Sequence, residues 1–119
     1  MTITMTQAII DSATFADLQN TAGAEFAAEL VGTFLEEAPG MLAALRSAHA
    51  AGDADAFRRA AHSIKSNAQT FGALRLGAMA RELELGGLAA QGPGQEAALD
   101  EIEAAYNQAA ATLQELCRG

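Results

Sequence analysis

The feature that most constrains the fold is an apolar stripe within residues 54–71. Five apolar residues recur there at spacings of four and three: Phe57, Ala61, Ile64, Ala68 and Phe71. That spacing follows the 3.6-residue period of an α-helix and not the alternation of a strand. Asp53 stands at the N-cap position and Gly72 at the left-handed C-cap position. The stretch is therefore predicted to be a helix that buries one face in a core.

The same apolar spacing continues along the chain, so the predicted fold class is all-α. It predicts further helices over residues 24–48, 73–90 and 99–116. Short links between consecutive helices make them antiparallel neighbours. We expect an antiparallel up-down four-helix bundle, with a short additional N-terminal helix lying across one end as a lid.

Individual residues within these helices give further expectations. Asp11 or Ser12 can N-cap the short first helix. Pro39 interrupts the second helix, for which we expect a kinked continuous helix, with a break and restart at Pro39 as the alternative. Phe26 and Leu116 fall on the apolar faces of the second and last helices and are expected to be buried.

The domain organisation is simple. Residues 1–8 carry no strong pattern and are expected to form a flexible N-terminal arm. Residues 9–119 are long enough for one core and are expected to form a single helical bundle domain. The clearest loop is Gly92-Pro93-Gly94, between the last two long helices.

Composition limits the partners of the chain. The formal net charge is −8 with only seven Lys and Arg, which excludes a nucleic-acid footprint and disfavours anionic membrane surfaces. No stretch of apolar residues is long enough to span a bilayer. The single cysteine, Cys117, cannot form an internal disulfide and fits a reducing compartment. We expect a cytoplasmic monomer.

Polar side chains gather on the side of the 54–71 helix away from its apolar stripe. His62 lies about 140° from the middle of the stripe. Lys65 and Gln69 follow it by three and seven residues on the same side, and Arg58 precedes it by four. An imidazole is a nucleophile near neutral pH, and a phosphoryl group on it would need the charge of Lys65 and the amide of Gln69 as donors. An isolated exposed histidine is usually only surface, so spacing alone does not assign this role.

The residues around His62 also resemble a known family. Ala61-His62-Ser63-Ile64-Lys65, followed by a small polar pair and Phe71-Gly72-Ala73, is similar to the signature of histidine-containing phosphotransfer (HPt) domains of two-component phosphorelays. The resemblance runs from about Ile9 to Leu116, nearly the whole chain. One departure is Ser66, where many members carry Gly so that a receiver domain can approach the backbone.

This resemblance implies a function and a site. His62 would be the phosphoacceptor, Lys65 its phosphate-side partner and Gln69 a further hydrogen-bonding neighbour. The chain would be a phosphorelay intermediate that accepts a phosphoryl group from a receiver-domain phospho-aspartate and passes it reversibly to another receiver. Its partners would be response-regulator receiver domains and a hybrid histidine kinase. No cofactor is expected on this chain, and Mg²⁺ belongs to the partner receiver domain only.

Other chemistries find little support in the sequence. No phosphate-cradling glycine loop is present, so a phosphotransfer carrier is favoured over a kinase or other stand-alone enzyme. No motif offers a metal site. Arg81, Glu82 and Glu84 are interpreted as a solvated, paired surface. Two rival functions stay open: a phosphorylation-independent receiver-binding or scaffold bundle, and a ligand-binding or redox bundle that uses His49 or Cys117.

Overall fold

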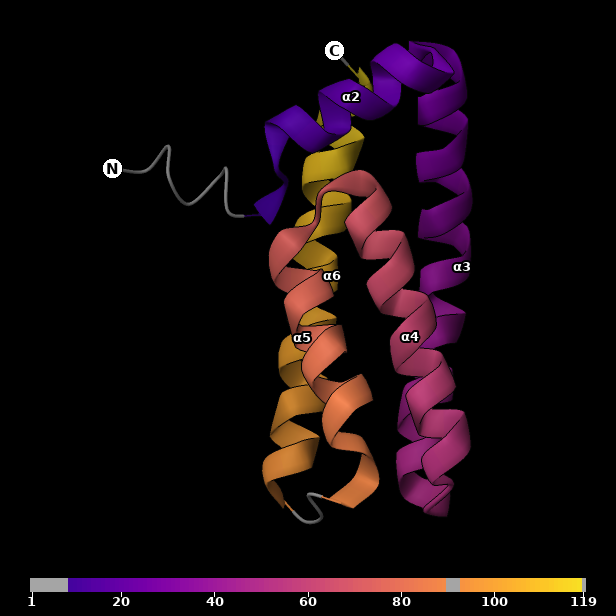
Figure 1. Cartoon of the computed structure of the whole chain (residues 1–119), viewed down its shortest axis with the longest axis vertical. Coiled ribbons are helices and arrows are strands. Elements are labelled where there is room, and N and C mark those ends of the chain that lie inside the picture. Colours follow the sequence, from indigo (N-terminus) through magenta and orange to yellow (C-terminus); the bar gives the residue numbers. More distant parts are fainter. Residues whose placement is uncertain (1–8, 90–92, 119) are drawn as a thin grey trace, which may run out of the picture.

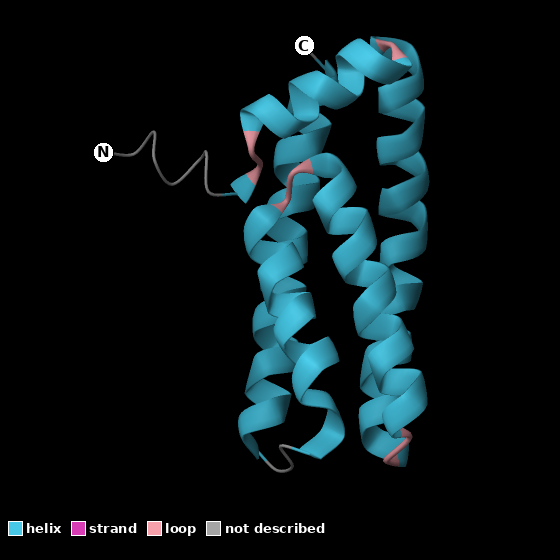
Figure 2. Cartoon of the chain, viewed as in Figure 1, coloured by secondary structure: helices cyan, strands magenta, loops and turns pink. Residues whose placement is uncertain are grey.

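The computed structural model describes residues 9–89 and 93–118 of the chain, and these residues form helices joined by short loops, with no strand among them (Figure 2). The helices are α2 (Ser12–Ala22), α3 (Ala24–Ala51), α4 (Ala54–Phe71), α5 (Leu74–Gly86), a 3₁₀ turn η1 (Gly87–Ala89) and α6 (Pro93–Arg118). The prediction of an all-α fold is confirmed. The arm expected at residues 1–8 and Gly92 of the expected loop lie outside the described residues.

The long helices α3, α4, α5 and α6 stand side by side and alternate in direction, while α2 crosses one end of the bundle (Figure 1). This arrangement confirms the predicted up-down bundle with a short N-terminal helix as its lid. The central position of α4, which contacts both α3 and α5, gives its polar side chains neighbours on two sides. Within the described residues, no helix combines the length and the apolarity that a membrane crossing requires.

The lid is joined to the end of α4 through two residues. Asp11 is the N-cap of α2, because its carboxylate accepts hydrogen bonds from the Thr14 backbone N–H (3.0 Å) and hydroxyl (2.5 Å). These bonds, the hydroxyl first, lower the pKa of Asp11. The Asp11 N–H in turn donates to the carbonyl of Gly72, 2.7 Å away. Gly72 ends α4 with a φ of 81°, the left-handed conformation that glycine adopts most readily.

The turn between α3 and α4 has the predicted caps. Gly52 ends α3 in the left-handed conformation, with a φ of 69°. Asp53 follows as the N-cap of α4, its carboxylate accepting from the Ala56 N–H at 3.1 Å. Both ends of the predicted helix over residues 54–71 are therefore confirmed, and the turn places α4 antiparallel to α3.

The core is centred on Phe34 of α3. Its ring stacks on Phe71 of α4 at 5.3 Å between centroids and meets the edge of Tyr106 of α6 at 5.8 Å. One aromatic cluster thus joins three helices at the lid end of the bundle. The predicted apolar stripe of α4 is buried along its length: Phe57, Ala61, Ile64, Ala68 and Phe71.

Two residues expected in the core are on the surface. Phe26 is 52% exposed, because Ala27 and Val31 set the buried face at the start of α3 and Phe26 lies about 100° away from Ala27. Leu116 is 42% exposed, and Cys117 packs against the core in its place. Both predictions were wrong. In each case the residue that packs on the core is the next one along the helix, about 100° further around its axis.

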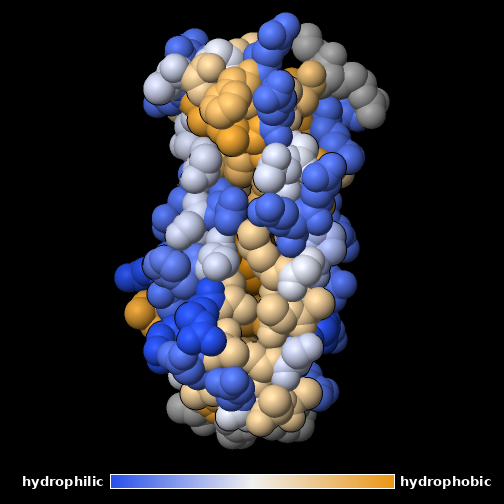
Figure 3. Space-filling view, turned by 90° about the vertical axis from the view of Figure 1, so that its right-hand side faces the viewer, coloured by the Kyte–Doolittle hydropathy of each residue, from blue (hydrophilic) through white to orange (hydrophobic). Residues whose placement is uncertain are grey.

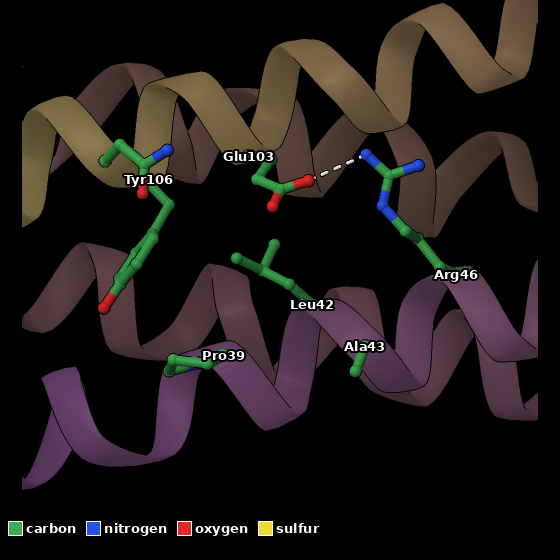
Figure 4. A pocket seen from close by; sticks show the side chains of 7 residues that line it. Pro39, Leu42, Ala43, Arg46, Glu103 and Tyr106 are labelled. Carbon is green, nitrogen blue, oxygen red and sulfur yellow. Dashed lines mark hydrogen bonds and ion pairs between the residues drawn. The ribbon is translucent and has the colours of Figure 1, made fainter.

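Helix α3 continues through Pro39, so the alternative of a break is wrong. Proline has no N–H to donate to the carbonyl four residues earlier, which belongs to Leu35. The Tyr106 hydroxyl lies 3.4 Å from that carbonyl oxygen and donates to it. Figure 4 shows Tyr106 of α6 beside Pro39, and further along the same groove the ion pair of Arg46 with Glu103 at 2.8 Å.

Helix α5 is shorter than predicted. It ends at Gly86 and passes into the 3₁₀ turn, whereas the apolar spacing predicted a helix to about residue 90. Gly87 caps it with a φ of 61° and is only partly buried. Two consecutive glycines outweigh the remaining apolar spacing, because each costs about 1 kcal/mol relative to alanine within a helix. The predicted loop is also shorter than expected, since Pro93 and Gly94 already belong to α6.

Candidate functional site

His62 lies on the solvent side of α4, about midway along the helix. Its side chain is 57% exposed, whereas Ala61 beside it and Ile64 two residues on are buried in the core. The predicted outward orientation of the imidazole is therefore what the structure shows. The apolar stripe that holds α4 in the bundle leaves this face of the helix to solvent.

A carboxylate from the neighbouring helix binds the imidazole. Glu84 of α5 places Oε2 2.9 Å from His62 Nδ1 and Oε1 2.8 Å from the Lys65 Nζ. The Glu84 side chain is only 18% exposed, so most of its surface is covered. Its contact with the Lys65 ammonium lowers the pKa of Glu84, burial opposes this, and the contact with His62 lowers it further. The carboxyl group is therefore a carboxylate at neutral pH.

This contact fixes which imidazole nitrogen is available. A carboxylate only accepts hydrogen bonds, so the His62 nitrogen that faces Glu84 carries the proton. In a neutral ring the other nitrogen, Nε2, then keeps its lone pair. The arrangement therefore points a nucleophilic nitrogen away from the carboxylate, on a ring that is more than half exposed.

The close approach of α4 and α5 depends on small residues. A Cβ added to Gly77 of α5 would lie 3.6 Å from the Ala68 Cβ and 3.7 Å from the Gln69 Cγ. Gln69 therefore lies opposite Gly77, two helical turns or about 10 Å along the axis from His62. The structure brings Lys65 into the same cluster as His62 and places Gln69 outside it.

Sequence reasoning missed Glu84, which was assigned to the solvated surface. The signal that could have found it is the symmetry of the α4–α5 hairpin. His62 is eleven residues before Ala73 and Glu84 eleven residues after it (73 − 62 = 84 − 73 = 11). In an antiparallel pair with a tight turn, such residues lie at the same height.

An open pocket of about 310 Å³ adjoins the imidazole. It is lined by Arg58, Arg59, His62, Ser63 and Glu84. Both guanidinium groups are bound to Asp55 in the first turn of α4: Arg58 at 2.5 Å, and Arg59 in a further ion pair. The cations of this pocket thus come from the turn that precedes His62.

A wider, shallow groove between α3 and α4 begins at the same place. Its volume is about 640 Å³, and it shares Arg59 and Ser63 with the pocket of the imidazole. Small residues from both helices form much of its floor: Gly40, Ala44, Ala56 and Ala60. Figure 3 shows the side of the bundle on which α3 lies, where a strip of apolar surface runs between hydrophilic side chains.

The other candidate residues lie apart from this site. His49 is half-buried near the end of α3, with its ring 6.4 Å from that of Phe57. Cys117 is partly buried near the end of α6, where burial raises the pKa of its thiol. A raised pKa leaves the thiol protonated and less nucleophilic. Among the residues that the structure describes, no cluster of His, Cys, Asp and Glu that could hold a metal ion includes either residue.

Comparison with known proteins agrees with the fold and shows the family. The model of the Hpt domain family matches residues 29–117, which include all of α4 and α5. The crystal structure of histidine-containing phosphotransfer protein B (HptB) from Pseudomonas aeruginosa PAO1 matches with a TM-score of 0.84 and 25% sequence identity, over 92% of this chain and 95% of that chain. A search of curated proteins found no match. The chain belongs to the Hpt domain family and has a histidine phosphotransfer role in two-component signalling.

Proposed function

We propose that His62 is the phosphoacceptor of a phosphorelay intermediate. It takes a phosphoryl group from the phospho-aspartate of one receiver domain and passes it to another. Hpt domains interact with receiver domains and kinases in phosphorelays, so both partner classes suit this chain. The observation that carries the proposal is the Glu84–Nδ1 contact of 2.9 Å, because it leaves Nε2 as an exposed nucleophile.

The transfer step follows from the orientation of the ring. The Nε2 lone pair attacks phosphorus, and the bond from phosphorus to the aspartyl oxygen breaks with its electron pair, releasing the donor carboxylate. The imidazole retains its Nδ1 proton and becomes cationic. Glu84 faces that proton and stabilises the developing positive charge. In the reverse step, a second receiver carboxylate attacks phosphorus and Nε2 leaves as a neutral nitrogen.

Lys65 has a supporting part in this scheme. Its side chain is only 21% exposed, and its ammonium is bound to the second oxygen of Glu84. It therefore holds the carboxylate in position against His62 and balances its charge. With the imidazole neutral, the three side chains together carry no net charge before transfer.

The groove between α3 and α4 is where we place the incoming receiver domain. It is continuous with the imidazole pocket through Ser63, and its small residues let another backbone approach closely. Ala44→Glu would put a charge and extra volume into this groove. We expect it to slow transfer from a receiver while leaving direct chemical phosphorylation of His62 unchanged. Equal slowing of both reactions would count against docking there.

Chemical phosphorylation tests the phosphoacceptor directly. Phosphoramidate is a small donor that needs no receiver, and the chain has only two histidines. We expect acid-labile, alkali-stable label on the wild type and on His49→Gln, but none on His62→Gln. Label that persists in His62→Gln would refute the proposal. A receiver domain that binds the wild type while no label ever appears would favour the phosphorylation-independent scaffold.

A further inference from the structure

We propose that Arg58 and Arg59 hold the phosphoryl group once it is on His62, and that Asp55 occupies both arginines while the histidine is unmodified. The inference rests on the proposed function of His62 and adds the residues that bind the transferred group. Sequence spacing pointed to Lys65 and Gln69 for that task. In the structure the Lys65 ammonium is bound to Glu84, and Gln69 lies two helical turns from His62.

Charge balance favours the arginines. The Lys65 ammonium is compensated by Glu84 at 2.8 Å, so this pair offers an incoming anion no net attraction. Arg58 and Arg59 share a single carboxylate, that of Asp55, which leaves one positive charge uncompensated (2 − 1 = 1). A phosphoryl group brings a charge of about −1.5 to −2 into a chain whose net charge is already −8. The arginine pair is therefore the local source of positive charge.

Helix geometry places the arginines on the correct side of the ring. Side chains on an α-helix lean toward its N-terminus, so the imidazole of His62 lies over the turn that carries Arg58 and Arg59. All three line the same pocket of about 310 Å³, together with Ser63 and, on the Nδ1 side of the ring, Glu84. Glu84 holds the Nδ1 side of the ring, so an adduct on Nε2 lies on the side of the ring away from that carboxylate, and we place it against the two arginines that line the same pocket.

The exchange of partners costs little. The side chains of Arg58, Arg59 and Asp55 are 55%, 69% and 57% exposed, and ion pairs that are this exposed to solvent contribute little to stability. A phosphoryl group offers three acceptor oxygens and more charge than one carboxylate, and arginine binds such oxygens in bidentate fashion. The phosphoryl group therefore displaces Asp55 from at least one guanidinium.

The test compares the lifetime of phosphohistidine in single-residue variants. In the labelling step Nε2 attacks phosphorus, the P–N bond of phosphoramidate breaks, and the amide leaves as ammonia after taking a proton from water. We expect Arg58→Gln and Arg59→Gln each to shorten the half-life of the adduct about threefold, and the double variant about tenfold. Asp55→Asn should lengthen it, because it removes the competing carboxylate.

Two further measurements separate this role from a structural one. A phosphorus NMR titration should give a higher phosphoryl pKa in the double variant than in the wild type, since cations favour the dianion. Arg46→Gln is the matched control, because it removes one arginine whose carboxylate partners, Asp100 and Glu103, are on α6. We expect it to leave both readouts unchanged.

The outcomes distinguish the inference from the proposed function. If the wild type takes no label on His62, the proposed function fails and the inference with it. If the wild type is labelled but the double variant matches it in half-life and phosphoryl pKa, the inference alone is overturned. It is overturned as well if Lys65→Ala shortens the half-life as much as the double arginine variant is expected to, about tenfold.

Discussion

Replacement of Gly72 by alanine tests how the lid is joined to the helix that carries the site. Gly72 has a φ of 81°, and a Cβ added there would lie 2.9 Å from the Asp11 carbonyl oxygen and 3.0 Å from the Thr14 Cβ. The first of these atoms is backbone at the start of α2, so it can move only if the lid moves. The Asp11 N–H bond to the Gly72 carbonyl, 2.7 Å long, would be displaced with it.

Gly52 provides the matched control for this substitution. It ends α3 as Gly72 ends α4, with a similar φ of 69°, but an added Cβ would meet nothing within 4 Å. Alanine in the left-handed conformation costs about 1–2 kcal/mol, which applies equally to both glycines. Overpacking against a neighbour that cannot move costs a further amount of about 1–3 kcal/mol. This second cost applies only to Gly72. We therefore expect Gly72→Ala to destabilise the protein by about 2–5 kcal/mol and Gly52→Ala by about 1–2 kcal/mol.

Urea unfolding of the two variants measures this difference directly. Hydrogen exchange at the Asp11 amide should also accelerate in Gly72→Ala and stay unchanged in Gly52→Ala. Equal losses of stability in the two variants would show that the lid yields freely. The close packing of α2 on the end of α4 would then have no energetic consequence, and the reasoning would be refuted.

Four further predictions follow from the site and the core. Glu84→Gln keeps an acceptor for Nδ1 but loses the charge, so phosphorylation of His62 by phosphoramidate should slow about fivefold in single-turnover labelling. Because the pKa of Glu84 is lowered in the folded protein, its ionic contribution to stability is present above the ordinary value of 4.5 and is lost as pH falls through the folded value. The difference in unfolding free energy between wild type and Glu84→Gln should therefore shrink as pH falls through that value. Lys65→Ala should release Glu84 and shorten the lifetime of phosphohistidine, but by less than the double substitution of Arg58 and Arg59 does. Time courses quenched in alkali measure both lifetimes. His62→Gln should change the unfolding free energy by less than about 0.5 kcal/mol in urea, since the ring is mostly exposed. Pro39→Ala restores an N–H for the carbonyl that Tyr106 binds, so Tyr106→Phe should cost about 1 kcal/mol in the wild type and less in the Pro39→Ala background, by a double-mutant cycle.

The parts of the fold that sequence predicted best are those set by local interactions. Helix α4 begins after Asp53 and ends before Gly72 because a capping carboxylate and a left-handed glycine act within a few residues of themselves. The outward orientation of His62 follows from the same local logic, since the apolar stripe fixes the rotation of α4. The caps and the stripe are legible within α4 itself, so these features could be predicted before its packing partners were known.

The parts that sequence missed depend on how helices meet. Whether Phe26 or Ala27 faces inward is decided by where the bundle lies, and a stripe of three-and-four spacing accommodates either. The Tyr106 hydroxyl reaches a carbonyl 71 residues away in sequence, which no local pattern indicates. Glu84 belongs to this class as well: its helix was predicted, but its place opposite His62 is set by the packing of Gly77 on Ala68.

In the function proposed above, the position of Glu84 suits His62 to exchange a phosphoryl group in both directions. In the adduct the ring carries positive charge at Nδ1 and the phosphoryl group carries negative charge beyond Nε2. The carboxylate of Glu84 lies on the first side, and the guanidinium groups of Arg58 and Arg59 line the pocket on the second. In the proposed adduct each of these charges thus faces an opposite one. This matching stabilises the adduct at both ends of the ring, which favours phosphoryl transfer onto an otherwise exposed histidine.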